Sequence, residues 1–108
     1  MTSLAQRQAE DRRGIILRSL NEDPGFTMAE MTLRRVLDIH GHVVSTAELR
    51  ADLEWLERGV LVRVDRHEMR PDVWSWSVQL LDEGQVVARG RSHPGVAHSR
   101  YAPNSGSR

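Results

Sequence analysis

The sequence contains no cysteine and no lysine, and only 5% of its residues are aromatic. Without cysteine the chain can form neither disulfides nor thiolate metal sites. All 15 basic residues are arginine, which we attribute to a GC-rich genome rather than to a binding mechanism. The chain has no run of about 18 apolar residues, and its first 14 residues lack the apolar core of a signal peptide. We therefore expect a soluble intracellular protein without membrane contact.

The charges balance overall but are distributed unevenly. Residues 1–88 contain 11 arginines and all 15 acidic residues, a net charge of −4, whereas residues 89–108 contain four arginines and no acid. Indiscriminate binding to phosphates depends on clustered cations that release counterions. The negative body therefore argues against tight nonspecific binding of nucleic acid.

The clearest helix signal lies in the middle of the chain. Ser45 is followed three residues later by Glu48, which is the spacing of a capping box. Leu49, Leu53 and Leu56 then recur at helical spacing, and Gly59 stops the helix. A helix is predicted from about Ser45 to Gly59.

Two further helices are predicted upstream. The first covers about Leu4–Leu20 and ends before a turn of sequence NEDPG. The second begins with another capping box, formed by Thr27 and Glu30, and ends at Gly41. Its core-facing stripe is predicted to consist of Ala29, Leu33, Val36, Leu37 and His40.

Strand patterns follow the third helix. Val60–Asp65 is apolar, and Val73–Leu80 alternates as a half-buried strand does, so that Trp74 and Trp76 are predicted to face the core. The polar link Arg66–Asp72 would be the wing of a hairpin. A stub strand is expected at Phe26 and Thr27, and a short closing helix within residues 81–89.

This order of elements predicts an α+β fold of the winged helix-turn-helix class, with three helices and a two- or three-stranded antiparallel wing sheet. We expect one winged-helix domain over residues 1–91. The composition of residues 92–108, rich in Gly, Ser, Pro, His and Arg, predicts a flexible basic tail.

The chain resembles small winged-helix proteins, described as ArsR-like, that are encoded by Mu-like bacteriophages and prophages. The shared pattern consists of an ILR-L-EDP opening, a GH-VS turn, an R-L-WLE helix and a GLV strand. These match Ile16, Leu17, Arg18, Leu20, Glu22, Asp23, Pro24, Gly41, His42, Val44, Ser45, Arg50, Asp52, Leu53, Trp55, Leu56, Glu57, Gly59, Leu61 and Val62. A later segment and a PGV tail match Leu81, Gly84, Val87, Ala88, Gly90, Arg91, Pro94, Gly95 and Val96.

The resemblance implies a phage- or prophage-derived regulator that binds double-stranded DNA in the cytoplasm of a bacterial host. It does not imply the metal sensing of ArsR proteins, because their cysteine site is absent here. The wing also departs from the Gly-rich version of the family, since RHEMRPD is longer and more charged.

The DNA-binding hypothesis assigns contacts to the third helix, the second helix and the wing. The candidate residues are Thr46, Ala47, Arg50, Ala51, Glu54, Arg34, Arg35, Arg66, His67 and Arg70. Arg50 is the candidate base reader, because an arginine can bond the O6 and N7 atoms of guanine together. The simpler interpretation of Arg50 is an ion pair with Glu54 at i+4, and the other arginines could be ordinary solvated surface.

A second hypothesis uses the same fold as a protein-interaction adaptor in phage replication, packaging or assembly. Glu48, Asp52, Glu54 and Glu57 make the third helix net negative, which suits a basic protein better than phosphate. Trp55 lies beside the leucine stripe and could pack on the first helix or on a partner. A homodimer is a further possibility that the sequence leaves open.

No catalytic motif stands out, and we expect no enzymatic activity and no cofactor. His40 and His42 form an H-x-H motif without a third ligand nearby, so no metal site is expected. His40 is interpreted as the end of the core stripe and His42 as part of the turn.

Overall fold

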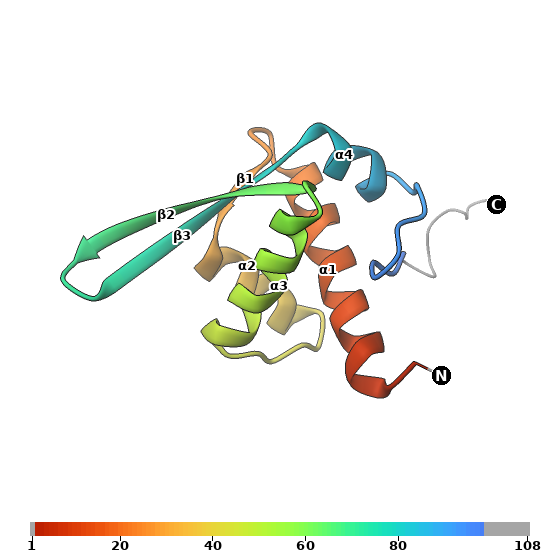
Figure 1. Ribbon diagram of the computed structural model, residues 1–108, viewed down its shortest axis with the longest axis horizontal. Coiled ribbons are helices and arrows are strands. Elements are labelled where there is room, and N and C mark those ends of the chain that lie inside the picture. Colours follow the sequence, from red (N-terminus) through yellow and green to blue (C-terminus); the bar gives the residue numbers. More distant parts are fainter. Residues whose placement is uncertain (1, 99–108) are drawn as a thin grey trace.

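The computed structural model describes residues 2–98, and it is an α+β structure of four helices and one three-stranded antiparallel sheet (Figure 1). The order is α1 (Leu4–Glu22), β1 (Thr27–Ala29), α2 (Glu30–Ile39), α3 (Thr46–Arg58), β2 (Val62–Arg70), β3 (Val73–Leu80) and α4 (Asp82–Ala88). No helix in this part of the chain is long and apolar enough to cross a membrane.

The predicted third helix is confirmed. Ser45 accepts a hydrogen bond from the Glu48 N–H, and the Glu48 carboxylate accepts one from the Ser45 N–H, so the capping box is complete. These bonds satisfy donors that have no partner inside the helix. The same device begins α1, where Ser3 and Gln6 form a capping box that the sequence analysis did not identify.

The predicted capping box of the second helix is wrong. Thr27 belongs to β1, the N-cap of α2 is Ala29, and no side chain caps this helix. The reason is tertiary: residues 27–29 pair with β3 through Thr27↔Gln79 and Ala29↔Ser77. The Glu30 carboxylate is consequently free to leave its own helix terminus and bind elsewhere.

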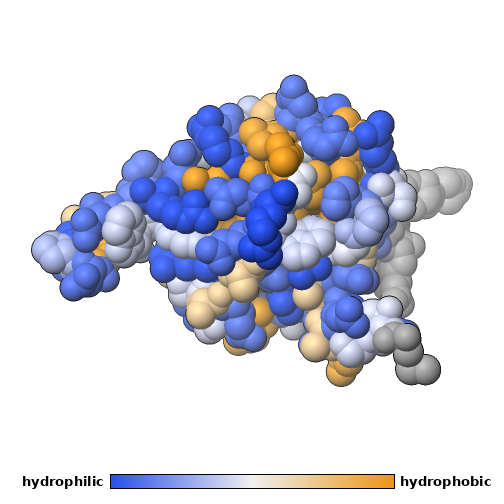
Figure 2. Space-filling view, viewed as in Figure 1, coloured by the Kyte–Doolittle hydropathy of each residue, from blue (hydrophilic) through white to orange (hydrophobic). Residues whose placement is uncertain are grey.

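The sheet has the strand order β1-β3-β2, and its hairpin is longer than predicted. Val60 adopts a positive φ of 59°, so β2 begins at Val62 rather than at Val60. Most of the predicted wing is strand, because pairing continues past a bulge to Arg70↔Val73. Only Pro71 and Asp72 form the turn, with Asp72 at φ 65°. The hairpin extends away from the helices as a mainly hydrophilic arm (Figures 1 and 2).

The core lies between the helices and the root of the sheet. Its fully buried members are mostly aliphatic: Ile16, Leu17, Leu20, Leu33, Leu37, Leu49, Leu53, Leu56, Leu61, Val62, Val78 and Val87. Trp74 and Trp76 were predicted to join them, but Trp74 is 47% exposed and Trp76 only partly buried. The alternation of β3 was interpreted correctly, yet the strand extends beyond the helices that would cover these two rings. His40 and Ala29 are exposed as well, so the predicted core stripe is one residue too long at each end.

Residues 93–97 lie against α1. The Ala97 N–H donates to the Glu10 carbonyl (3.0 Å), and the Arg13 guanidinium donates to the Gly95 carbonyl (3.0 Å). Val96 is buried. Gly14 permits this contact, because a Cβ at this position would lie 2.1 Å from the Ala97 carbonyl oxygen. The domain boundary at residue 91 stays a prediction, and most of the predicted flexible tail (residues 99–108) lies outside the described residues.

We predict that Gly84→Ala destabilises the protein, although alanine is the better helix former. An added Cβ at Gly84 would lie 2.1 Å from the Leu61 carbonyl oxygen and 2.6 Å from Leu80 Cδ1. Overpacking of this kind typically costs about 1–3 kcal/mol, which exceeds the helix-propensity gain of about 1 kcal/mol. The measurement is urea unfolding followed by circular dichroism.

Gly59→Ala is the matched control, since a Cβ there meets nothing closer than 3.6 Å and the φ of −81° suits alanine. Its unfolding free energy should change by no more than about 0.5 kcal/mol. A Gly84→Ala variant as stable as the wild type would show that α4 does not pack tightly on the start of β2.

Candidate interaction surface

A buried ion pair joins α2 to α3. The Arg50 Nε donates to Glu30 Oε1 and its second terminal nitrogen to Glu30 Oε2, each at 2.7 Å. The Glu30 side chain is only 5% exposed, whereas that of Arg50 is 27% exposed. Such a bidentate, charge-assisted pair fixes both position and orientation of the two side chains.

The same pair also closes the open edge of β3. β1 ends at Ala29, so the next groups along β3 have no strand beside them. Glu30 Oε2 accepts the Trp76 N–H (3.0 Å), and Arg50 donates to the Trp74 carbonyl (3.0 Å). Two side chains therefore continue the hydrogen bonding of β1 past its end, which protects an edge that could otherwise pair with another chain.

The pKa values follow from these contacts. Burial by itself raises the pKa of Glu30, but the hydrogen bonds from Arg50 and from the Trp76 N–H outweigh it and hold that pKa below its ordinary value. The hydrogen bond to Glu30 raises the pKa of Arg50. Both groups are thus held in their charged forms.

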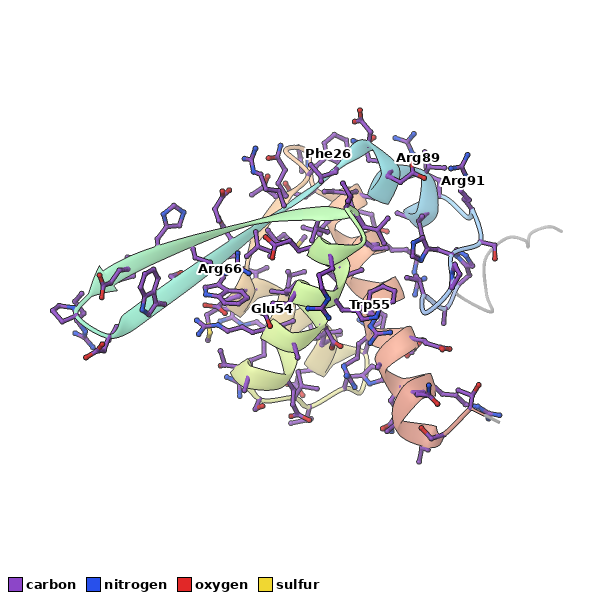
Figure 3. All side chains as sticks on the ribbon, in the orientation of Figure 1. Phe26, Glu54, Trp55, Arg66, Arg89 and Arg91 are labelled. Carbon is purple, nitrogen blue, oxygen red and sulfur yellow. The ribbon has the colours of Figure 1, made fainter. Side chains whose placement is uncertain are left out.

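A second ion pair joins α3 to the hairpin. Arg66 donates to both carboxylate oxygens of Glu57, at 2.9 and 3.2 Å, and lies 4.0 Å from Glu54. The hydrogen bond from Arg66 lowers the pKa of Glu57. The guanidinium groups of Arg66 and Arg50 stack on the Trp76 ring at 4.3 and 4.7 Å from its centroid. Figure 3 shows Glu54 and Arg66 between α3 and the hairpin.

The candidate residues of α3 therefore differ in what they can reach. Ala47, Ala51 and Glu54 are exposed, as is Glu48 of the capping box. Thr46 is half-buried and accepts a bond from Arg34 (3.4 Å). Arg50 is not a free surface cation, because it binds Glu30. It also does not form the ion pair with Glu54 that the i+4 spacing suggested. The outward face of α3 thus consists of small side chains and acidic side chains.

Asp52 does not contribute to that acidic face. It is buried and accepts two hydrogen bonds from Arg12 of α1, at 2.6 and 3.3 Å, with Arg13 at 3.8 Å. Asp52 was expected to contribute, with Glu48, Glu54 and Glu57, to a net negative third helix, and helical spacing does not say which neighbour covers a flank. The arginine pair at positions 12 and 13 was the available signal.

The remaining candidates divide between the fold and the surface. Arg34 donates to the Val44 carbonyl (2.9 Å) and so holds the turn between α2 and α3. Arg35 is exposed on α2, and His67 and Arg70 are exposed on the hairpin. The side chains of Arg50, Arg66 and Arg34 therefore form hydrogen bonds to other residues of the protein, while those of Arg35, His67 and Arg70 are exposed.

Trp55 is partly buried on the α1 side of α3 (Figure 3). The Arg13 guanidinium lies 4.0 Å from a ring centroid, and His93 meets the indole edge-on at 5.9 Å. Gly95 touches the same ring so closely that a Cβ would lie 2.4 Å from it. Of the two roles left open by the sequence, packing on the first helix is confirmed.

The two histidines of the H-x-H motif, His40 and His42, lie against protein groups. His40 Nδ1 lies 2.9 Å from the Val36 carbonyl oxygen, and His42 Nε2 lies 2.6 Å from Asp11 of α1. Within residues 2–98, no three His, Asp or Glu side chains come together in a way that could hold a metal ion.

Comparison with known proteins identifies relatives in a phage and in a bacterium. The chain is 39% identical over 83 residues to gp26 of Escherichia phage Mu, an uncharacterised protein, and the match covers 77% of this chain and 80% of gp26. It is 35% identical over 57 residues to an uncharacterised protein of Haemophilus influenzae, which covers 53% of this chain and 55% of that protein. No protein-family model matches the chain.

We predict that Glu30→Gln removes an acid-sensitive part of the stability. Because the pKa of Glu30 is lowered by folding, its stabilising contribution is complete above its ordinary value of about 4.5 and is lost as the pH falls through the lowered value. Loss of the charged pair should cost roughly 1–3 kcal/mol at neutral pH. Urea unfolding of both proteins between pH 7 and pH 3 measures this.

Glu54→Gln is the control, because Glu54 is exposed and 4.0 Å from its nearest cation. It should shift the unfolding free energy by less than about 0.5 kcal/mol at every pH. Parallel pH profiles for the wild type and Glu30→Gln would contradict the role assigned to Glu30.

Proposed function

The chain belongs to the family of the phage Mu protein gp26, and we propose that it is a winged helix-turn-helix protein that acts as a protein-interaction adaptor in the phage cycle. The winged-helix assignment is supported by the order of α1, β1, α2, α3 and the β2–β3 hairpin. In that architecture α3 holds the position of the recognition helix, and the hairpin holds that of the wing.

The observation that carries the adaptor proposal is the Glu30–Arg50 pair. To read a guanine, Arg50 would have to leave Glu30, whose side chain is 5% exposed and would then keep only the hydrogen bond from the Trp76 N–H. Removing one partner of a buried ion pair costs up to about 3–5 kcal/mol. A bidentate guanine contact returns only about 1–3 kcal/mol. The exchange is unfavourable, which supports a role for Arg50 in the fold rather than in base recognition.

The exposed face of α3 supports the same conclusion. Ala47 and Ala51 allow another surface to approach the helix closely, and Glu48 and Glu54 give that face a negative charge. Phosphates would be repelled there, whereas a basic protein segment would be attracted. The partner that fits best is a phage-encoded protein that presents arginine or lysine side chains to α3.

We predict that Glu54→Arg abolishes recovery of this partner. Tagged wild-type and variant proteins are used as bait in lysates of cells producing the phage, and the captured proteins are quantified by mass spectrometry. Like charges across the interface should lower the recovered amount by about tenfold or more. Glu22→Arg, the same charge reversal on an exposed residue of α1, is the control and should recover the partner as the wild type does.

Equal recovery with Glu54→Arg would exclude α3 as the docking face. Tight, sequence-selective binding of duplex DNA from upstream of the protein's own operon would instead overturn the adaptor proposal.

A second candidate function, DNA binding as a regulator, is favoured by the hairpin. His67 and Arg70 are exposed on an arm that extends from the body (Figure 1), as a phosphate-contacting wing would be. Exposed Arg35 on α2 could contact a further phosphate. This function would rely on backbone contacts and DNA shape, since α3 offers no free arginine on its central turns.

For this candidate we predict that Arg70→Ala weakens binding to all duplexes alike and lowers the logarithmic salt slope by about 0.9 per lost phosphate contact. Fluorescence anisotropy at several salt concentrations measures both quantities. Arg7→Ala, an exposed change on α1, serves as the control. The adaptor proposal expects negligible duplex affinity at physiological salt for the wild type and for both variants.

A further inference from the structure

α2 has an outward face that nothing in the described part of the chain covers. Met31 is 55% exposed and Ile39 is 77% exposed, and Val43 in the following turn is 83% exposed. Three large apolar side chains on one short helix and its adjoining turn are more than isolated surface residues, which need no explanation. This face lies outside the α3 surface of the proposed function.

A shallow groove of about 240 Å³ runs along this face. On the helix it is lined by Met31, Arg34, Arg35 and Asp38, which share one side because they are spaced i, i+3, i+4 and i+7. Its other wall is formed by Val43 and Val44. The hydrogen bond from Arg34 to the Val44 carbonyl ties the two walls together, so the groove is held open by the fold.

Of the three charged side chains on this face, Arg34 is held by the Val44 carbonyl, and the other two are complementary to each other. Arg35 and Asp38 are both exposed, they carry opposite signs, and neither has an ion-pair partner within 4.0 Å among residues 2–98. When two copies of a helix pack antiparallel about a two-fold axis, each lower-numbered residue faces a higher-numbered one. The axis that passes between positions 35 and 38 sets Arg35 against the partner's Asp38, twice.

We propose that this face of α2 binds a second copy of the chain in an antiparallel, two-fold dimer. Two reciprocal Arg35–Asp38 pairs would flank a contact made by Met31 and Val43. A formal net charge of zero leaves no overall repulsion between copies. The helix has 10 residues, so the interface is small, and we expect a dissociation constant on the order of 10–100 µM.

Sedimentation equilibrium across this concentration range tests the proposal. Arg35→Asp and Asp38→Arg should each weaken the dimer by about tenfold or more, because like charges then face each other. The double variant exchanges the two charges and should restore dimerisation. Val43→Asp should abolish it, while Arg7→Asp on α1 should leave it unchanged. Far-ultraviolet circular dichroism checks that each variant is folded.

Three outcomes would overturn the dimer: a wild type that stays monomeric throughout the range, single variants that dimerise like the wild type, or a double variant that fails to recover. Glu54→Arg should dimerise normally, since it lies on α3. Failure of the adaptor proposal and failure of the dimer are therefore separate results.

Discussion

The buried pair between Glu30 and Arg50 is the constraint on which the arrangement of helices and sheet depends. Glu30 accepts the Trp76 N–H, and Arg50 donates both to Glu30 and to the Trp74 carbonyl. One carboxylate and one guanidinium thus connect the start of α2, the middle of α3 and the outer part of β3. Because the pair is bidentate, it also fixes the orientation of the two side chains that bind β3. The Trp76 ring then stacks against Arg50 and Arg66.

Arginine–carboxylate pairs also join two other pairs of elements. Arg12 and Asp52 join α1 to α3, and Arg66 and Glu57 join α3 to β2. Arginine suits this use, because its planar fork presents several donors to one carboxylate. Arg12, Arg50 and Arg66 are consequently neutralised by carboxylates of the protein itself. The side chains that remain exposed on the outward face of α3 include the acidic Glu48 and Glu54.

Close backbone approaches complete the packing of a small core. Gly14 admits the Ala97 carbonyl to α1, Gly84 admits the Leu61 carbonyl to α4, and Gly95 lies on the Trp55 ring. Each glycine lets two segments approach more closely than a side chain would allow. The segment at residues 93–97 thereby covers Trp55 and extends the buried surface of α1, which matters in a domain whose core is almost entirely aliphatic.

The sequence by itself determined the elements whose signals are local. The capping box at Ser45, the leucine spacing of α3, the alternation of β3 and the closing helix α4 all depend on residues near each other in the chain. Tertiary structure decided the rest. Thr27 joined a strand because β3 was beside it, and Glu30 bound Arg50 rather than its own helix terminus. The tryptophans of β3 stay partly exposed to solvent because the hairpin extends beyond the helices that could cover them. Arg50 and Glu30 are 20 residues apart in the sequence, and Arg12 and Asp52 are 40 residues apart. Whether such residues meet depends on how the elements pack, which no local sequence pattern specifies.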